Sequence, residues 1–321
     1  MHYARLNVEE ATSLYAHMTW IRRVQKDYKR NKYLIWMLIP ILTYYLVFHY
    51  APMYGTLIAF KDYSPRLGVW GSDWVGLRNF RTFFNGAQFE RVLTNTVLLS
   101  CYQILFGFPA PLLLALALNE IRCEPFKRTV QTISYMPHFI SVMVLCGMLV
   151  DFCNTRGILT QLVSALTGAE PRNLLLRPEL FRTIYVSSGI WQEIGFGSII
   201  YLSALSGIDP MLYEAATIDG ATRRQQLLHV TLPGIATTVT VMFLLRIGRM
   251  MNVGYEKVIL LYNASTYETA EIISTYVYKR GLLDMDYSLG SAVDLFNSVI
   301  NLVLLVTFNT LSKRLTENSL F

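Results

Sequence analysis

The sequence predicts an all-α membrane protein with about six transmembrane helices. Apolar residues make up 53% of its 321 residues and charged residues only 16%, whereas soluble domains usually carry about 25% charged residues. Six separate segments are apolar over about 20 residues, the length that crosses a bilayer as a helix. The net charge of +6 is concentrated before the first of these segments, where cytoplasmic anchoring charge is expected, and does not indicate a nucleic-acid-binding protein.

The six predicted spans form one transmembrane domain over residues 33–321. The first span is long and contains Pro52 and Gly55, so we expect it to cross the membrane and then bend along the surface. No Cys-x-x-Cys pair occurs among the four cysteines, which are interpreted as free thiols. The spans are expected at about 33–60, 92–118, 130–152, 182–205, 232–251 and 290–311.

Residues 1–32 precede the first span and are predicted to form a cytoplasmic amphipathic segment. Apolar residues recur there at helical spacing beside a basic face, which is typical of a helix lying on the inner leaflet. A frayed tail is the alternative. The apolar positions are Val8, Ala11, Leu14, Met18 and Ile21.

The distribution of lysine and arginine favours a cytoplasmic N-terminus. The first 32 residues hold seven of these cations and the loop 119–129 holds three, whereas the loop 252–289 holds three against five acidic residues. The loop 61–91 also holds five cations, so charge alone is weak evidence. With six spans, the C-terminus and the segment between spans four and five are then also cytoplasmic.

The polar segment at about 206–231, between spans four and five, predicts two short helices outside the bilayer. Asp209-Pro210 provides an N-cap and a first helical residue, and Asp219-Gly220 provides a stop. Thr222 and Gln225 predict the cap of the second helix. Ala215 and Ala216 allow another surface to approach the backbone closely and Glu214 offers a charge, so we predict a protein-docking role rather than an ordinary loop.

This segment resembles a family signature. Glu214-Ala215-Ala216, Gly220 and Leu232-Pro233 are similar to the "EAA…G…LP" signature of permease subunits of bacterial binding-protein-dependent ABC importers. The stretches "YAPMYGTLIAFKDYSP", "FGFPAPLLLALALNE" and "YNASTYETAEIISTYVYKRGL" resemble the carbohydrate and polysaccharide subgroup. The resemblance extends from about Lys32 to the C-terminus.

The resemblance implies a multi-pass subunit of the bacterial cytoplasmic (inner) membrane that transports and is not an enzyme. It implies that Glu214, Ala215, Ala216, Asp219 and Gly220 belong to a coupling helix that docks into an ATP-hydrolysing subunit. The implied partners are a second permease, two nucleotide-binding subunits and an extracytoplasmic solute-binding protein. This chain lacks a Gly-x-x-x-x-Gly-Lys-Ser/Thr phosphate loop, so ATP and magnesium are expected on the partner ATPase, and the chain itself needs no cofactor.

Arg246 and Arg249 are the most unusual residues of the predicted spans, because charge inside a bilayer is costly. Their spacing of three places them on one helical face in the outer half of span five. The subgroup tends to have uncharged amides there, so we interpret the two arginines as ligands for an anionic sugar. The alternatives are an ion pair with Glu193 or Asp294, or snorkelling to the outer surface.

Other candidate residues for the substrate pathway lie in spans four and six. Trp191, Gln192 and Glu193 offer an aromatic ring for stacking and polar groups for hydroxyls, although small residues nearby equally suit helix packing. Asp294 belongs to a polar stripe of span six and Asn297 is adjacent to it; such a stripe faces protein or water, so it either contacts another subunit or lines the pathway. Histidines at metal-ligand spacing are absent from the sequence, so no metal site is predicted.

These observations predict the permease of an ATP-driven importer of an oligosaccharide or polysaccharide, with an acidic polymer such as alginate as the specific hypothesis. A permease for neutral oligosaccharides is the alternative. A secondary transporter would show inverted repeats and broken helices around an ion site. A multispan membrane enzyme would show an acid/base or metal cluster at the interface, and the sequence shows neither pattern.

Overall fold

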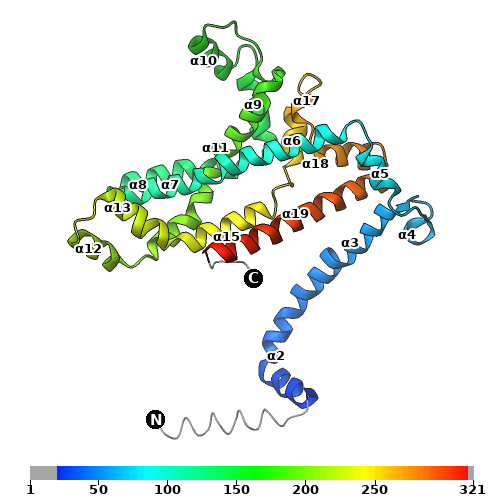
Figure 1. Ribbon diagram of the computed structural model, residues 1–321, viewed down its shortest axis with the longest axis horizontal. Helices are drawn as coiled ribbons and strands as arrows, with labels where there is room; N and C mark the ends of the chain where they lie inside the picture. The colour runs from blue at the N-terminus through cyan, green and yellow to red at the C-terminus, as the bar shows by residue number, and fades with distance from the viewer. Residues whose placement is uncertain (1–19, 317–321) are drawn as a thin grey trace. The chain divides into compact units, whose positions relative to one another are not determined.

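The computed structural model describes residues 20–316, with side chains from residue 28 to residue 314 (Figure 1). The chain divides into two compact units, Met1–Leu57 and Ile58–Phe321. Most of the predicted amphipathic segment of residues 1–32 lies outside the described residues. Each unit is considered by itself below.

The described part of the first unit is helical, with a kink at Asn31. Helix α2 covers Trp20–Tyr45, followed by the π-helical turn η1 (Leu46–Tyr50), α3 (Ala51–Met53) and the 3₁₀ turn η2 (Tyr54–Phe60), whose last residues begin the second unit. Residues Tyr28–Phe60 are long and apolar enough to cross a membrane, and none of the most apolar window is buried. Lipid is the solvent that suits such side chains. The helix tightens at Tyr54, next to the predicted bend at Pro52 and Gly55.

The second unit begins with a small hairpin. Strand β1 (Lys61–Asp62) pairs antiparallel with β2 (Asp73–Trp74), with Lys61 opposite Trp74, and α4 (Gly68–Gly71) lies between them. Helix α5 (Arg78–Phe84) follows. Helix α6 (Phe89–Tyr102), η3 (Gln103–Gly107) and α7 (Pro109–Glu120) then form one candidate span of 32 residues.

The third predicted span is not a straight helix. Helix α8 (Glu124–Tyr135) ends in the 3₁₀ turn η4 (Met136–Phe139), and α9 (Val142–Cys153) leaves it at 99°. Pro137 disfavours continuation of α8, and the Ser141 side chain accepts a hydrogen bond from the Val144 N–H and starts a new helix. Helix α10 (Ile158–Thr167) and the turn η5 (Leu174–Leu176) follow.

Spans four and five enclose the predicted polar segment. Helix α11 (Pro178–Ser206) turns by 67° into α12 (Pro210–Ile218). The chain returns through α13 (Arg223–Gln226), η6 (Leu227–Thr231) and α14 (Leu232–Gly234), and bends by 61° into α15 (Ala236–Ile247). Span five was expected as a continuous helix to residue 251, but it is broken at Ile235 and ends at Ile247. Arg249 therefore lies in the turn that follows α15, not on the helical face of Arg246.

The last part of the chain returns to α11 before the final span. Helices α16 (Tyr255–Leu261), α17 (Tyr267–Ala270) and α18 (Ile273–Val277) are short, and the π-helical turn η7 (Tyr278–Leu283) follows. Helix α19 (Tyr287–Thr316) is the last element. Within the second unit, α12 and α13 lie at one end, and α5 and α18 lie at the opposite end (Figure 1).

Helix α11 is the centre of the second unit, where it packs against α6, α7, α8 and α17. A Cβ atom on Gly195 would lie 2.0 Å from the Ser134 carbonyl oxygen, and one on Gly197 would lie 3.1 Å from Pro111. These glycines let α8 and α7 approach α11 closely. The described chain has three helices able to cross a membrane, or six if each bent pair is one span. This architecture confirms the predicted all-α membrane fold.

Candidate functional site

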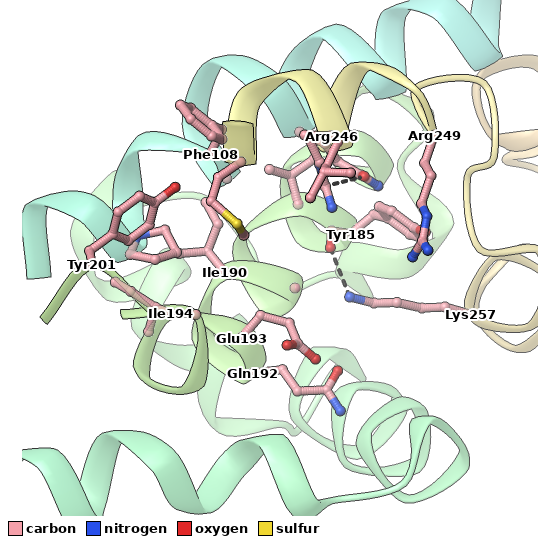
Figure 2. A pocket seen from close by; sticks show the side chains of 18 residues that line it. Phe108, Tyr185, Ile190, Gln192, Glu193, Ile194, Tyr201, Arg246, Arg249 and Lys257 are labelled. Atoms are coloured by element: carbon pink, nitrogen blue, oxygen red, sulfur yellow. Dashed lines mark hydrogen bonds between the residues drawn. The ribbon is translucent and has the colours of Figure 1, made fainter. Parts of the chain in front are cut away.

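A cavity of about 650 Å³ lies beside α11 in the second unit (Figure 2). One wall is α11, and the others come from η3, α7, α15 and the start of α16. Apolar and aromatic side chains share the lining with a few polar groups, the composition that is typical of small-molecule sites. The polar and charged lining side chains include Gln103, Tyr185, Gln192, Glu193, Tyr201, Arg246, Arg249 and Lys257.

Three cationic side chains line this cavity. Arg246 donates from Nη2 to the Gln103 amide oxygen at 2.8 Å, and Lys257 donates from Nζ to the Tyr185 carbonyl oxygen at 2.9 Å (Figure 2). The Lys257 ammonium also lies 4.7 Å from the centre of the Tyr185 ring. Both cations are thus held by neutral groups, which orient the charge without cancelling it.

Arg249 is positioned by the turn after α15. Two amides of α19 fix this turn, because Asn297 and Asn301 both donate to the Asn252 side-chain oxygen, at 2.9 and 3.1 Å. Asn301 also accepts the Met251 N–H at 2.9 Å. Arg249 itself is exposed and lines the cavity.

Glu193, the one carboxylate of the cavity lining, contacts His138. Glu193 Oε2 lies 3.0 Å from His138 Nδ1, and the His138 ring stacks on Phe196 with the ring centres 3.8 Å apart. Among the described residues, no acidic side chain forms an ion pair with Arg246 or Arg249. The lining of the cavity thus carries three cations and one carboxylate, so it has an excess of positive charge.

The structure brings four of the seven predicted pathway residues to the cavity: Gln192, Glu193, Arg246 and Arg249. Trp191 instead lines a second, apolar pocket of about 310 Å³ between α9, α10 and α11. Asp294 is exposed on α19, outside the cavity lining. Asn297 is buried in the amide cluster described above, so its contacts are within the chain. Its position supports Arg249 rather than lining the cavity.

Sequence reasoning did not identify Lys257, Gln103 or His138 as residues of this site. Lys257 stands in the short apolar helix α16 and is only 8% exposed. The apolar run that follows Lys257, from Val258 to Leu261, is the signal that could have identified it, because buried lysines need a specific partner. Gln103 and His138 carry no comparable local signal.

The predicted docking segment folds as its sequence indicates. The Asp209 side chain accepts the Met211 N–H and caps α12, and Thr222 with Gln225 forms a capping box on α13. Gly220 has φ +76°, the left-handed conformation that favours glycine at a helix end. Glu214, Ala215 and Asp219 are exposed, and Ala216 is half-buried. Met211 and Ile218 are 70% and 87% exposed, so α12 presents apolar side chains that none of the described residues covers.

The comparisons with known proteins identify the family. Residues 96–317 match the sequence model of one protein family. That family is described as "Binding-protein-dependent transport system inner membrane component". The chain belongs to this family. It is therefore a multi-pass inner-membrane permease, a transport component and not an enzyme.

Two relatives from Bacillus subtilis (strain 168) cover most of the chain. Protein LplB is 44% identical over 294 residues, which are 91% of this chain and 92% of that protein. The polygalacturonan/rhamnogalacturonan transport system permease protein YteP is 42% identical over 292 residues, 91% of each chain.

Two solved structures share the fold along nearly the whole chain. One is a bacterial ABC transporter involved in the import of the acidic polysaccharide alginate, with a TM-score of 0.84, 43% identity and coverage of 92% of this chain and 99% of that chain. The other is a bacterial alginate ABC transporter in complex with alginate pentasaccharide-bound periplasmic protein. Its TM-score is 0.85, with 42% identity and coverage of 93% and 100%.

Proposed function

We propose that this chain forms part of the translocation pathway of an ATP-driven importer for an acidic polysaccharide of the alginate type. The observation that carries the proposal is the cavity beside α11, whose lining holds three cations, Arg246, Arg249 and Lys257, and one carboxylate, that of Glu193. Guanidinium groups bind carboxylates through paired, charge-assisted hydrogen bonds. A polyuronate that entered this cavity would supply the missing negative charge.

The relatives support the same class of substrate. Alginate, named for the solved transporter, and polygalacturonan, one of the two polymers named for YteP beside rhamnogalacturonan, are both built from uronic acids. They share a carboxylate on each sugar unit and differ in the sugar, so the likeness favours the acidic class rather than one polymer. A permease for neutral oligosaccharides is the alternative.

The proposed assembly contains this chain, a second related permease, two nucleotide-binding subunits and an extracytoplasmic solute-binding protein. Support comes from the family and from the alginate transporter solved with its periplasmic protein. The exposed helix α12, with Glu214, Ala215 and Ala216, is the proposed contact with a nucleotide-binding subunit. ATP and magnesium would bind that subunit.

The test compares acidic and neutral oligosaccharides on the reconstituted complex with its binding protein. Arg246→Gln and Arg249→Gln should each reduce acidic stimulation of ATP hydrolysis by about tenfold, because a hydrogen bond to a charged group contributes about 1.5–3 kcal/mol. The reduction should be steeper at low salt, where electrostatic attraction is screened less. Arg156→Gln, an exposed arginine in the loop after α9, serves as the matched control and should change little.

Two results would contradict the proposal. In the first, the arginine variants affect acidic and neutral sugars equally. In the second, the variants misfold and recover when Glu193 or Asp294 is neutralised as well. The second result would mean that the arginines serve as ion-pair partners in another conformation of the transporter.

A further inference from the structure

A fourth cation, Arg182, stands on α11 closer to the end of this helix that lies away from α12. Its Nη2 donates to the Asn95 side-chain oxygen on α6 at 2.8 Å. Its Nε atom is buried and has no hydrogen-bond partner. Among the described residues, no acidic side chain forms an ion pair with Arg182. Its guanidinium is therefore oriented by a neutral amide and keeps both its charge and an unused donor.

This arrangement repeats the one found in the cavity, where Arg246 donates to the Gln103 amide at the same distance of 2.8 Å. Asn95 and Gln103 are eight residues apart on the continuous helical run of α6 and η3, and so lie on one side of it. At 1.5 Å per residue, the two amides are about 12 Å apart along the helix. The helical run of α6 and η3 thus holds two arginines at two levels, Arg182 of α11 through Asn95 and Arg246 of α15 through Gln103.

Arg182 also lies on the side of α11 that faces the cavity. It precedes the lining residues Tyr185, Val186 and Gly189 by three, four and seven positions, which places all four on one helical face. Between the two levels, Leu99 of α6 and Tyr185 of α11 are buried in one apolar cluster. Arg182 therefore lies about one helical turn along α11 from the lining residue Tyr185 and is not itself part of the lining.

Asn95 links Arg182 to an ion-pair cluster. Asn95, which holds Arg182, also donates to the backbone carbonyl oxygens of Glu268 and Glu271, at 2.8 and 3.0 Å. The buried Glu271 carboxylate pairs with Arg91 and, at 3.0 Å, with Lys279. Both contacts of this carboxylate therefore go to cations other than Arg182.

We propose that Arg182 is a second subsite for a carboxylate of the acidic saccharide, engaged before the sugar reaches Arg246. This inference rests on the proposed function and adds to it a length requirement. A saccharide short enough to occupy only the cavity contacts Arg246 and not Arg182. A longer polyuronate, with a carboxylate on each unit, bridges the distance of about 12 Å between the two levels and contacts both.

The experiment measures ATP hydrolysis by the complete complex, reconstituted with its binding protein, as a function of the concentration of two probes. The probes are a disaccharide and a pentasaccharide of the same uronic acid. Arg182→Gln should raise the half-stimulating concentration of the pentasaccharide about tenfold, the effect of one lost charge-assisted hydrogen bond, and leave that of the disaccharide unchanged. Arg182→Lys keeps the charge and should retain most of the preference for the longer probe.

The matched control is Arg172→Gln, which removes an exposed arginine ten residues earlier in the chain, before α11 begins. It should affect neither probe. Arg246→Gln should weaken both probes, and this result tests the proposed function separately. Suppose that Arg246→Gln weakens stimulation by both probes. If Arg182→Gln then weakens stimulation by both probes equally, or by neither probe, the proposal of a subsite at Arg182 is wrong and the proposed function stands.

A structural role for Arg182 predicts a different pattern. If the side chain only ties α11 to α6, then Arg182→Gln lowers the melting temperature of the complex and reduces stimulation by both acidic probes and by a neutral pentasaccharide alike. If Arg182→Gln does not fold, Arg182→Lys decides. An equal loss for the disaccharide and the pentasaccharide in that variant would overturn the proposal, and a retained preference for the pentasaccharide would support it.

Discussion

Lys257 connects the cavity to an observable pH dependence. It belongs to α16, which follows span five and lies outside the six candidate spans. Burial lowers the pKa of Lys257 from its ordinary value of 10.5 to about 8, although the nearby Cys146 and Glu193 oppose this shift. The ammonium is therefore charged in the folded protein below pH 8 and becomes neutral above it.

We expect Lys257→Met to reduce uptake of acidic oligosaccharide at pH 7 by about tenfold, through loss of one charged contact. The ratio of the wild-type rate to the Lys257→Met rate should fall as the pH rises from 7 to 9. The stability of the wild type relative to Lys257→Met should instead increase with pH. Because the pKa is lower in the folded state than in the unfolded state, the stability of the wild type relative to Lys257→Met should rise between about pH 8 and 10.5.

Uptake assays and melting curves over this pH range check both expectations. A rate ratio that does not change with pH would show that Lys257 does not contribute its charge to the substrate. Uptake of a neutral sugar, measured with the same two proteins, corrects for pH effects on the other subunits.

At the scale of single residues, the sequence indicates which charged side chains are costly to place in a membrane. It does not indicate which side chains lie together in the fold. Arg246 and Arg249 could be predicted because charge in an apolar segment needs a reason. Lys257 could not be placed, since its burial depends on the chain returning from span five to pack α16 against α9 and α18, near α11. For Asn297, the sequence shows a polar residue in an apolar segment. It does not show the partner, because Asn252 is 45 residues away in the chain.

At the scale of elements, α12 gives a direct test of the docking role. Ala216→Trp should leave membrane insertion and melting temperature unchanged, because α12 has no fully buried residue. The same change should abolish ATP-driven uptake, since a large side chain prevents close approach of a partner to the backbone. Uptake in vesicles and co-purification of the nucleotide-binding subunit are the measurements.

Ala169→Trp provides a matched control for this prediction, because Ala169 is exposed in the loop after α10. It should preserve uptake. An Ala216→Trp transporter that assembles and transports at the wild-type rate would refute the docking role of α12.

The ends of α12 could be predicted because their causes are local. Asp209, Gly220 and Thr222 act on backbone groups within three residues of themselves. The 99° break between α8 and α9 could not be predicted in the same way. Pro137 occurs in a segment that is apolar on both sides, and hydropathy alone indicates only that the segment is long enough to span. Whether a proline kinks or breaks a span depends on its neighbours, here Gln192 of α11, which donates to the Ile140 carbonyl oxygen at 2.8 Å.

At the scale of the whole molecule, the six candidate spans fix which loops share a side of the membrane. Helix α12 lies between spans four and five, and the loop that contains Ser265 lies between spans five and six. These two segments must therefore face opposite sides. The fold alone leaves both orientations open, and the lysine and arginine distribution favours a cytoplasmic α12.

Single cysteines at Arg224 and Ser265 test this orientation, in a background from which the four native cysteines have been removed. Both positions are exposed in this chain. In intact spheroplasts, an impermeant thiol reagent should label Ser265→Cys and not Arg224→Cys, and Arg224→Cys should react after the membrane is permeabilised. Labelling of Arg224→Cys in intact spheroplasts would show that the topology is the inverse of the one expected here. A nucleotide-binding subunit in the cytoplasm could then not reach α12, and the order of contacts from Arg182 to Arg246 would be reversed.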